Sequence, residues 1–170
     1  MKLFYKTNYK SPLGFITICC DENENIVGLW FEGQKHFADN IDGNIVENNN
    51  LKIFYTTKQW LDKYFKGKHP DIKEIPIKFI GNEFKKSVWK ILCKIPYGKT
   101  ITYGDIAKQM ANQKGITKMS AQAVGGAVGH NPISIIVPCH RVVGKNGQLT
   151  GYAAGINKKK KLLNLEQANI

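Results

Sequence analysis

The chain has 170 residues and a formal net charge of +12. This length allows a buried core and one or two small domains. No apolar run approaches the ~20 residues that a membrane-spanning helix needs, and the first residues lack the apolar region of a signal peptide. The cysteines at positions 19, 20, 93 and 139 form no Cys-x-x-Cys pair. Because this spacing argues against a disulfide framework and a zinc ribbon, we expect reduced thiols in the cytoplasm.

The positive charge is concentrated in one half of the chain. Residues 1–80 carry 11 lysines against 10 acidic residues, a net charge of +1. Residues 81–170 carry 13 lysines and one arginine against three acidic residues, a net charge of +11. A field confined to one domain suits a polyanion-binding surface. The composition therefore favours nucleic acid as a partner over a merely solvated basic face.

The first half predicts a small sheet covered by a helix. Strand-like runs separated by turn-forming residues cover 3–9, 13–20 and 26–32. Residues 33–49 are polar and rich in Asn and Gly, which indicates a loop or a poorly regular segment. Residues 51–66 carry apolar side chains at helical spacing. Since no catalytic cluster stands out, we interpret residues 1–80 as an N-terminal α/β scaffold domain.

The second half, residues 81–170, has a mainly helical pattern. Thr102 and Asp105 form a capping-box signature. The predicted helices cover residues 84–95, 102–110, 119–129 and 157–167. Two short helices joined by a turn in a basic domain resemble a helix-turn-helix. The predicted fold class is therefore α+β, with a small N-terminal sheet-plus-helix domain followed by a mainly helical C-terminal domain.

The helix predicted over 119–129 is poor in bulky side chains. Residues 120–129 read SAQAVGGAVG, and each glycine inside a helix costs about 1 kcal/mol relative to alanine. Close approach of another surface can offset this cost. That surface is either a neighbouring helix or a narrow groove of DNA, which Gln122 would then enter as the one long polar side chain.

The helix predicted over 157–167 begins with an unfavourable charge. Its first turn holds lysines 158–161, and a helix N-terminus favours negative rather than positive charge. A solvated lysine face explains this run, and nearby phosphates would make it tolerable. Glu166 is the only acidic residue of the helix.

A short polar stretch lies between two apolar runs near residue 140. Residues 135–137 and 142–143 are apolar and mostly β-branched, so the tetrapeptide Pro-Cys-His-Arg at 138–141 should be held against the core. Proline fixes its own φ and suits a rigid turn. This turn presents a thiol, Cys139, followed directly by an imidazole, His140. The alternative is that Cys139 only packs as a small buried residue.

These residues resemble the methylated-DNA–protein-cysteine methyltransferases, suicidal repair proteins that take alkyl groups from O6-alkylguanine. The likeness covers residues 81–168 in order. It rests on Phe84-x3-Val88-Trp89, Ile95-Pro96-Tyr97-Gly98-Lys99-Thr100, Tyr103-Gly104-Asp105-Ile106-Ala107, Gly125-Gly126-Ala127, Asn131-Pro132 and Pro138-Cys139-His140-Arg141-Val142-Val143-Gly144. The resemblance implies direct-reversal DNA repair by a single-turnover enzyme, with residues 81–170 as the DNA-binding and alkyl-acceptor domain.

The resemblance also implies the catalytic residues. Cys139 would accept the alkyl group, His140 would deprotonate it through a water, and Glu166 would hold the resulting imidazolium. Asn131 would fix the site through hydrogen bonds. Attack on a saturated carbon needs a soft anionic nucleophile, which a cysteine thiolate provides. The product is a stable thioether, so each molecule acts once, and neither a metal nor a cofactor is implied.

The implied substrate is double-stranded DNA that carries O6-alkylguanine or O4-alkylthymine, bound by a monomer. A stacked base cannot reach a buried thiol, so the nucleotide must be flipped at a cost of a few kcal/mol. The implied DNA-binding residues are Tyr103, Gln122, Ala123 and Gly125, and the implied base-pocket residues are Tyr103, Val142, Tyr152 and Ala153. Tyr103 would push on the target phosphate.

One position departs from the family pattern. Gln122 stands where the family usually has an arginine, which fills the gap left by the flipped base. Glutamine can still hydrogen-bond an orphaned cytosine, but it lacks the charge and the stacking plane of a guanidinium. The departure bears on DNA affinity and base flipping rather than on alkyl transfer.

Three other functions compete with this one. A non-enzymatic sensor of alkylated DNA would lack the acceptor cysteine, whereas Cys139 is present. A helix-turn-helix transcription factor would need Arg, Asn and Gln side chains along its recognition helix, and residues 119–129 do not supply them. A cysteine hydrolase would need a substrate cleft that the sequence does not imply.

Overall fold

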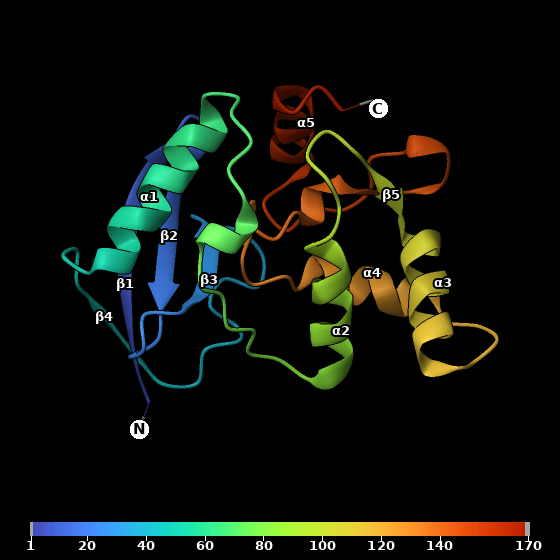
Figure 1. The fold of residues 1–170 in the computed structure, drawn as a ribbon, viewed down its shortest axis with the longest axis horizontal. Helices are drawn as coiled ribbons and strands as arrows, with labels where there is room; N and C mark the ends of the chain where they lie inside the picture. Colours follow the sequence, from blue (N-terminus) through green and yellow to red (C-terminus); the bar gives the residue numbers. More distant parts are fainter. Residues whose placement is uncertain (1, 169–170) are drawn as a thin grey trace. The chain divides into compact units, whose positions relative to one another are not determined.

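A computed structural model describes residues 2–168, which form two compact units. Unit 1 extends to Ile80 and also includes Pro132–Ser134, whereas unit 2 consists of Gly81–Asn131 and the chain from Ile135 onward. Unit 1 holds a sheet and a helix, and unit 2 is mainly helical, so the predicted α+β fold class is confirmed (Figure 1). None of the helices within residues 2–168 is both long and apolar enough to cross a membrane.

Unit 1 is built on a four-stranded sheet with the spatial order β3-β2-β1-β4. Its strands are β1 (Leu3–Ser11), β2 (Gly14–Cys20), β3 (Ile26–Phe31) and β4 (Asn44–Glu47). β1 and β3 each pair antiparallel with β2, and β4 pairs parallel with β1. The three predicted strands are confirmed, but the loop predicted over 33–49 was wrong at β4. This short edge strand has three exposed residues, so it lacks the apolar alternation that identifies a strand.

Each face of the sheet packs against other parts of unit 1. Helix α1 (Lys52–Phe65) lies along one face (Figure 1). There the Tyr9 hydroxyl of β1 donates to Asp62 Oδ1 of α1 at 2.6 Å. The 3₁₀ helix η1 (Ile72–Glu74) follows α1. On the other face a buried cluster is packed against Ala38, Ile41, Ile45 and Ile80; its members are Phe4, Cys19, Val27 and Trp30. Cys19 and Cys20 are fully buried, as small apolar residues would be.

Unit 2 combines helices with one pair of short parallel strands. Its elements are α2 (Glu83–Leu92), β5 (Ile101–Thr102), α3 (Tyr103–Lys114), α4 (Ala121–Gly129), η2 (Cys139–Arg141), β6 (Val142–Val143), η3 (Lys145–Gly147) and α5 (Ile156–Leu165). β5 pairs with β6 so that Thr102 lies opposite Val143. This pairing brings the start of α3 next to the chain that follows the central Pro-Cys-His-Arg tetrapeptide.

Helices α3 and α4 form the predicted helix-turn-helix (Figure 1). The Thr102 hydroxyl accepts from the Asp105 N–H at 3.0 Å, and Asp105 Oδ2 accepts from the Thr102 N–H at 3.1 Å. The predicted capping box is therefore confirmed. α3 continues to Lys114, past its predicted end, because Ala111 is buried and Gly115 supplies a left-handed C-cap with a φ of 67°.

Helix α2 supports α4 from the interior of unit 2. The buried indole of Trp89 on α2 donates from Nε1 to the carbonyl oxygen of Ala127 on α4 at 2.9 Å. Val124 and Val128 of α4 are also buried, whereas Gln122 and Ala123 are exposed. One side of α4 is thus fixed by packing, and the opposite side remains open to solvent.

Candidate active site

The chain between α4 and β6 holds the Pro-Cys-His-Arg tetrapeptide, and residues 131–143 are buried throughout. Asn131 fixes the start of this segment, because its Nδ2 donates to the Val137 carbonyl oxygen at 2.8 Å. Ile135 has a left-handed φ of 69°, a strained conformation for a β-branched residue. The single turn η2 then presents Cys139, followed by His140. The predicted burial of the tetrapeptide is confirmed.

His140 and Glu166 form the central contact of the site. His140 Nε2 lies 2.6 Å from Glu166 Oε2, and both side chains are fully buried. Glu166 is the C-cap of α5, so the end of this helix delivers a carboxylate to η2. The backbone N–H of Gly98 also donates to Glu166 Oε1 at 3.1 Å. The structure thereby brings the predicted imidazole and carboxylate into one hydrogen-bonded pair.

Arg141 completes this network, a role that the sequence pattern does not predict. Its Nε donates to Glu166 Oε1 at 2.8 Å, and its Nη2 donates to Glu166 Oε2 at 3.1 Å. Its Nη1 donates to the Ile95 carbonyl oxygen at 2.6 Å. This two-pronged contact is the geometry in which arginine binds a carboxylate most strongly. The one available signal in the sequence was that Arg141 is the only arginine in the chain.

The network keeps Glu166 ionised. Burial by itself raises the pKa of Glu166, but hydrogen bonds and charge from His140 and Arg141 outweigh burial and hold that pKa well below its usual value. Burial lowers the pKa of His140, more than the contact with Glu166 raises it. A neutral imidazole that donates from Nε2 to Glu166 has its basic lone pair on Nδ1. The pair is therefore arranged as a base with an orienting carboxylate.

Cys139 is only 7% exposed. Burial raises the pKa of its thiol, while a hydrogen bond with Asn131 and the positive charge of Lys159 act in the opposite direction. The resting group is therefore a thiol, which needs a base before it can attack. Cys139 lies on the same turn as His140, which Glu166 contacts, and a thiol, an imidazole and a carboxylate are the groups that an activated cysteine nucleophile needs.

Lys159 was not identified as a site residue. The lysine run at the start of α5 was expected to face solvent, but Lys159 is fully buried, so that expectation was wrong at this position. Its Nζ donates to the carbonyl oxygens of Thr150 and Gly151 at 3.0 and 3.1 Å. A sequence pattern cannot separate this lysine from its neighbours, because only the loop that folds over it distinguishes them.

Tyr103 connects the loop before α5 with α4. Its hydroxyl donates to the Thr150 carbonyl oxygen at 3.1 Å. A Cβ placed on Gly125 of α4 would lie 3.7 Å from the Tyr103 ring, so the two residues are close neighbours. Tyr152 and Ala153 are half-buried in the same loop, and Val142 is fully buried next to η2. The predicted pocket residues thus lie on three neighbouring segments of unit 2.

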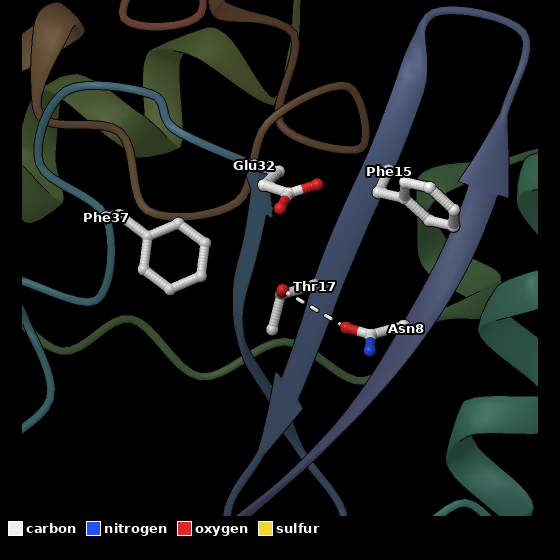
Figure 2. Close-up of a pocket in the computed structure, with 5 residues that line it drawn as sticks. All are labelled: Asn8, Phe15, Thr17, Glu32 and Phe37. Atoms are coloured by element: carbon white, nitrogen blue, oxygen red, sulfur yellow. Dashed lines mark hydrogen bonds between the residues drawn. The ribbon is translucent and has the colours of Figure 1, made fainter.

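A metal centre and a surface pocket are the alternatives to this network among residues 2–168. No group of three His, Cys, Asp or Glu side chains within this range could hold a metal ion. A pocket of about 400 Å³ lies on the sheet of unit 1, with Phe37 and Phe15 on opposite sides of Glu32 and Thr17 (Figure 2). Asn8 also lines it, and this pocket offers neither a thiol nor an imidazole. The candidate active site is therefore the buried network of unit 2.

Family comparisons agree with this location. Residues 83–168 match the family model for the 6-O-methylguanine DNA methyltransferase DNA binding domain. Residues 4–79 match the model for the ribonuclease-like domain of the same enzymes. The two matches together cover most of the chain, and the candidate active site lies within the first.

Individual relatives lead to the same family. The methylated-DNA–protein-cysteine methyltransferase of Haemophilus influenzae is 38% identical over 167 residues, which span 98% of this chain and 88% of the relative. The enzyme of that name from Methanosarcina mazei is 45% identical over 163 residues, 95% of this chain and 96% of the relative. The crystal structure of Mycobacterium tuberculosis OGT in complex with DNA matches with a TM-score of 0.79 and 36% identity, over 97% of this chain and 92% of that one. This chain belongs to the methylated-DNA–protein-cysteine methyltransferase family.

Proposed function

We propose that this enzyme repairs alkylated DNA by transferring the alkyl group of O6-alkylguanine, or of O4-alkylthymine, to Cys139 in a single turnover. The observation that carries the proposal is the buried pair of His140 and Glu166, 2.6 Å apart, in which His140 lies on the turn that presents Cys139 and Glu166 comes from the end of α5. Attack on a saturated carbon requires a thiolate, and a base close to the thiol can generate it. Family membership supports the same chemistry.

The reaction needs one proton transfer and one substitution. His140 accepts the thiol proton through a water and becomes an imidazolium, which the Glu166 carboxylate stabilises. The thiolate sulfur attacks the alkyl carbon, so an S–C bond forms and the bond between that carbon and guanine O6 breaks. The electron pair stays on the guanine, which is neutralised by a proton. Since the thioether is not readily cleaved, each protein molecule reacts once.

The open face of α4 supports binding in a DNA groove. A Cβ added to Gly126 or to Gly129 would meet no atom within 4 Å, so intramolecular packing does not require glycine at either position. Each of these glycines lowers helix stability, and tight packing against another helix does not explain why they are present. We infer that Gln122, Ala123 and Gly125 contact double-stranded DNA, as a slim helix can approach the groove floor closely.

The target base would occupy the space between Tyr103 and the loop before α5. Tyr152, Ala153 and Val142 would line this pocket once the nucleotide is flipped. Backbone groups would read the base edge at Ala153, which has no polar side chain. The present hydrogen bond from Tyr103 to Thr150 would have to be exchanged when Tyr103 meets the phosphate or the base.

Residues 81–170 would bind DNA and accept the alkyl group as a monomer, and residues 1–80 would act as a scaffold. A cytoplasmic location is consistent with Cys19, Cys20, Cys93 and Cys139, which are all free thiols.

The proposal is tested by counting repaired bases. A duplex with one O6-methylguanine is incubated with increasing amounts of protein, and the modified base is quantified by chromatography after DNA hydrolysis. We expect loss of one O6-methylguanine per protein molecule and no loss with Cys139→Ser. Tight binding without base conversion would indicate a non-enzymatic damage sensor, and continuous turnover would exclude the suicide mechanism.

A further inference from the structure

The pocket on the sheet of unit 1 has no part in the proposed function. Two of its lining residues, Phe15 and Phe37, have exposed aromatic rings, with exposed fractions of 51% and 39%. The Glu32 carboxylate and the Thr17 side chain lie between these rings (Figure 2). The pocket volume of about 400 Å³ is at the lower end of the range for ligand sites. It therefore suits a single side chain better than a nucleotide or a large cofactor.

The fold holds the Phe37 ring in place. Phe37 packs on the buried ring of Trp30, with 5.1 Å between the ring centres. The residues on either side of it, His36 and Ala38, both have left-handed φ values, of 61° and 59°. Backbone strain of this kind persists only where the surrounding structure fixes it, and it is concentrated at binding sites. This wall of the pocket is therefore formed before any ligand arrives.

The polar groups of the pocket are mainly hydrogen-bond acceptors. Glu32 is held beside Phe15, because its N–H donates to the Phe15 carbonyl oxygen at 2.9 Å. The Thr17 hydroxyl donates to Asn8 Oδ1 at 3.4 Å, so the lone pairs of its own oxygen remain available. A carboxylate likewise offers acceptors and no donor. The lining therefore favours a ligand that donates N–H bonds and carries a positive charge.

No cation of the chain itself takes this place in the part of the chain that the structure describes. Within residues 2–168, Glu32 makes no ion pair, and no lysine or arginine lies over the ring of Phe15 or Phe37. Lys10 lies opposite Phe15 in the pairing of β1 with β2, but its side chain is exposed. A single exposed apolar side chain is ordinary. Two rings on either side of a carboxylate, however, form an arrangement that binds a cation through charge and through the ring faces.

We propose that this pocket binds an arginine side chain from a basic peptide segment of a partner protein. A guanidinium is planar, stacks on aromatic rings and donates several N–H bonds in a fixed geometry, whereas an ammonium is compact and strongly hydrated. The Glu32 carboxylate would accept two of these bonds, and Phe15 and Phe37 would flank the guanidinium. Unit 1 repels such a peptide little, since residues 1–80 carry a net charge of only +1. None of the lining residues belongs to the candidate active site, so this binding is independent of alkyl transfer.

A peptide titration followed by NMR tests this binding. The full-length protein, labelled with ¹⁵N, is titrated with an acetylated and amidated Gly-Arg-Gly peptide. We expect saturable amide shifts at Phe15, Thr17 and Glu32. A peptide with citrulline, which keeps the shape of arginine but lacks its charge, should give no such shifts, and a lysine peptide should bind more weakly. Equal binding of the citrulline or lysine peptide, or shifts spread over other acidic surfaces, would overturn the inference.

Variants of exposed residues assign the binding to the pocket. Glu32→Gln should weaken binding of the arginine peptide about fivefold, whereas Glu47→Gln, at an exposed position of β4, should not change it. Phe15→Ala should weaken binding about threefold. Tyr55→Ala, which removes a 65% exposed ring from α1, is the matched control and should have no effect. Unchanged affinity in either Glu32→Gln or Phe15→Ala would overturn the inference.

Discussion

The loop around Cys139 and the open face of α4 lie in the same unit but are built in opposite ways. Around Cys139 the polar side chains are buried and hydrogen-bonded. The Glu166 carboxylate, for example, accepts hydrogen bonds from His140, Arg141 and the backbone of Gly98. On α4, Gly126 has open space where a side chain would begin. On the proposed function, reactivity would depend on buried charges and hydrogen bonds, whereas groove binding would depend on the absence of side chains. Variants of the loop should therefore change thiol chemistry, and variants of α4 should change DNA affinity.

The largest expected effect follows loss of the Glu166 charge. Glu166→Gln keeps the shape of the side chain but leaves the buried Arg141 guanidinium without its counter-ion. We expect the free energy of unfolding in a urea titration to fall by about 3 kcal/mol and alkyl transfer to slow at least a hundredfold. Glu83→Gln is the matched control, because the Glu83 carboxylate is 92% exposed and its contact with Lys86 is worth little. An equal effect of both substitutions would refute the role given to the buried network.

The same carboxylate should shape the acid dependence of stability. The pKa of Glu166 is depressed in the folded state, so its contribution is fully present above the unfolded-state pKa of about 4.5. This contribution should be lost as the pH falls below that value toward the folded-state pKa. Unfolding titrations at a series of pH values should therefore show a steeper loss on acidification for the wild type than for Glu166→Gln. Parallel curves would mean that Glu166 is not specifically stabilised in its ionised form.

The proposed groove-binding role of α4 is tested by adding a side chain to its open face. Gly126→Leu should raise helix stability by up to about 1 kcal/mol, because leucine has the higher helix propensity. It should nevertheless weaken DNA binding by about tenfold or more, equivalent to roughly 1.4 kcal/mol, in a fluorescence anisotropy titration. Iodoacetamide reactivity of Cys139 should not change. Asn164→Leu, on an exposed position of α5, controls for added apolar bulk, and equal loss of affinity in both would remove α4 from the interface.

Backbone strain distinguishes the loop in a further way. Ile135→Ala and Ile135→Gly both remove the same buried side chain, but only glycine also relieves the left-handed φ of 69°. Ile135→Gly should therefore be more stable than Ile135→Ala by about 1 kcal/mol in thermal melts. At Val137, which is buried in the same loop, alanine should be the more stable of the two. The same order at both positions would argue that Ile135 is not strained.

The smallest expected effect concerns Gln122 at the exposed start of α4. Gln122→Arg should tighten DNA binding a few-fold and steepen its salt dependence by roughly one unit, as one more phosphate or base contact gains a charge. Binding titrations from low to physiological salt measure this slope. An unchanged slope would place residue 122 outside the DNA interface.

Local signals predicted more of the fold than of the site. The Thr102–Asp105 capping box and the strands of unit 1 follow from short-range patterns. β4 did not, since its four residues are too few to show a strand pattern and its pairing with β1 is set by the sheet. Arg141 and Lys159 were missed for a related reason. Their partners, Glu166 and the carbonyls at 150 and 151, become neighbours only after the chain folds.

The central claim is that Cys139 is the alkyl acceptor, and peptide mapping after repair tests it most directly. The protein is incubated with an equimolar duplex that contains one O6-methylguanine, digested, and sequenced by tandem mass spectrometry. We expect one added methyl group on Cys139, while Cys19, Cys20 and Cys93 stay unmodified as internal controls. A methyl group on another cysteine, or none at all on a protein that still binds the duplex, would contradict it.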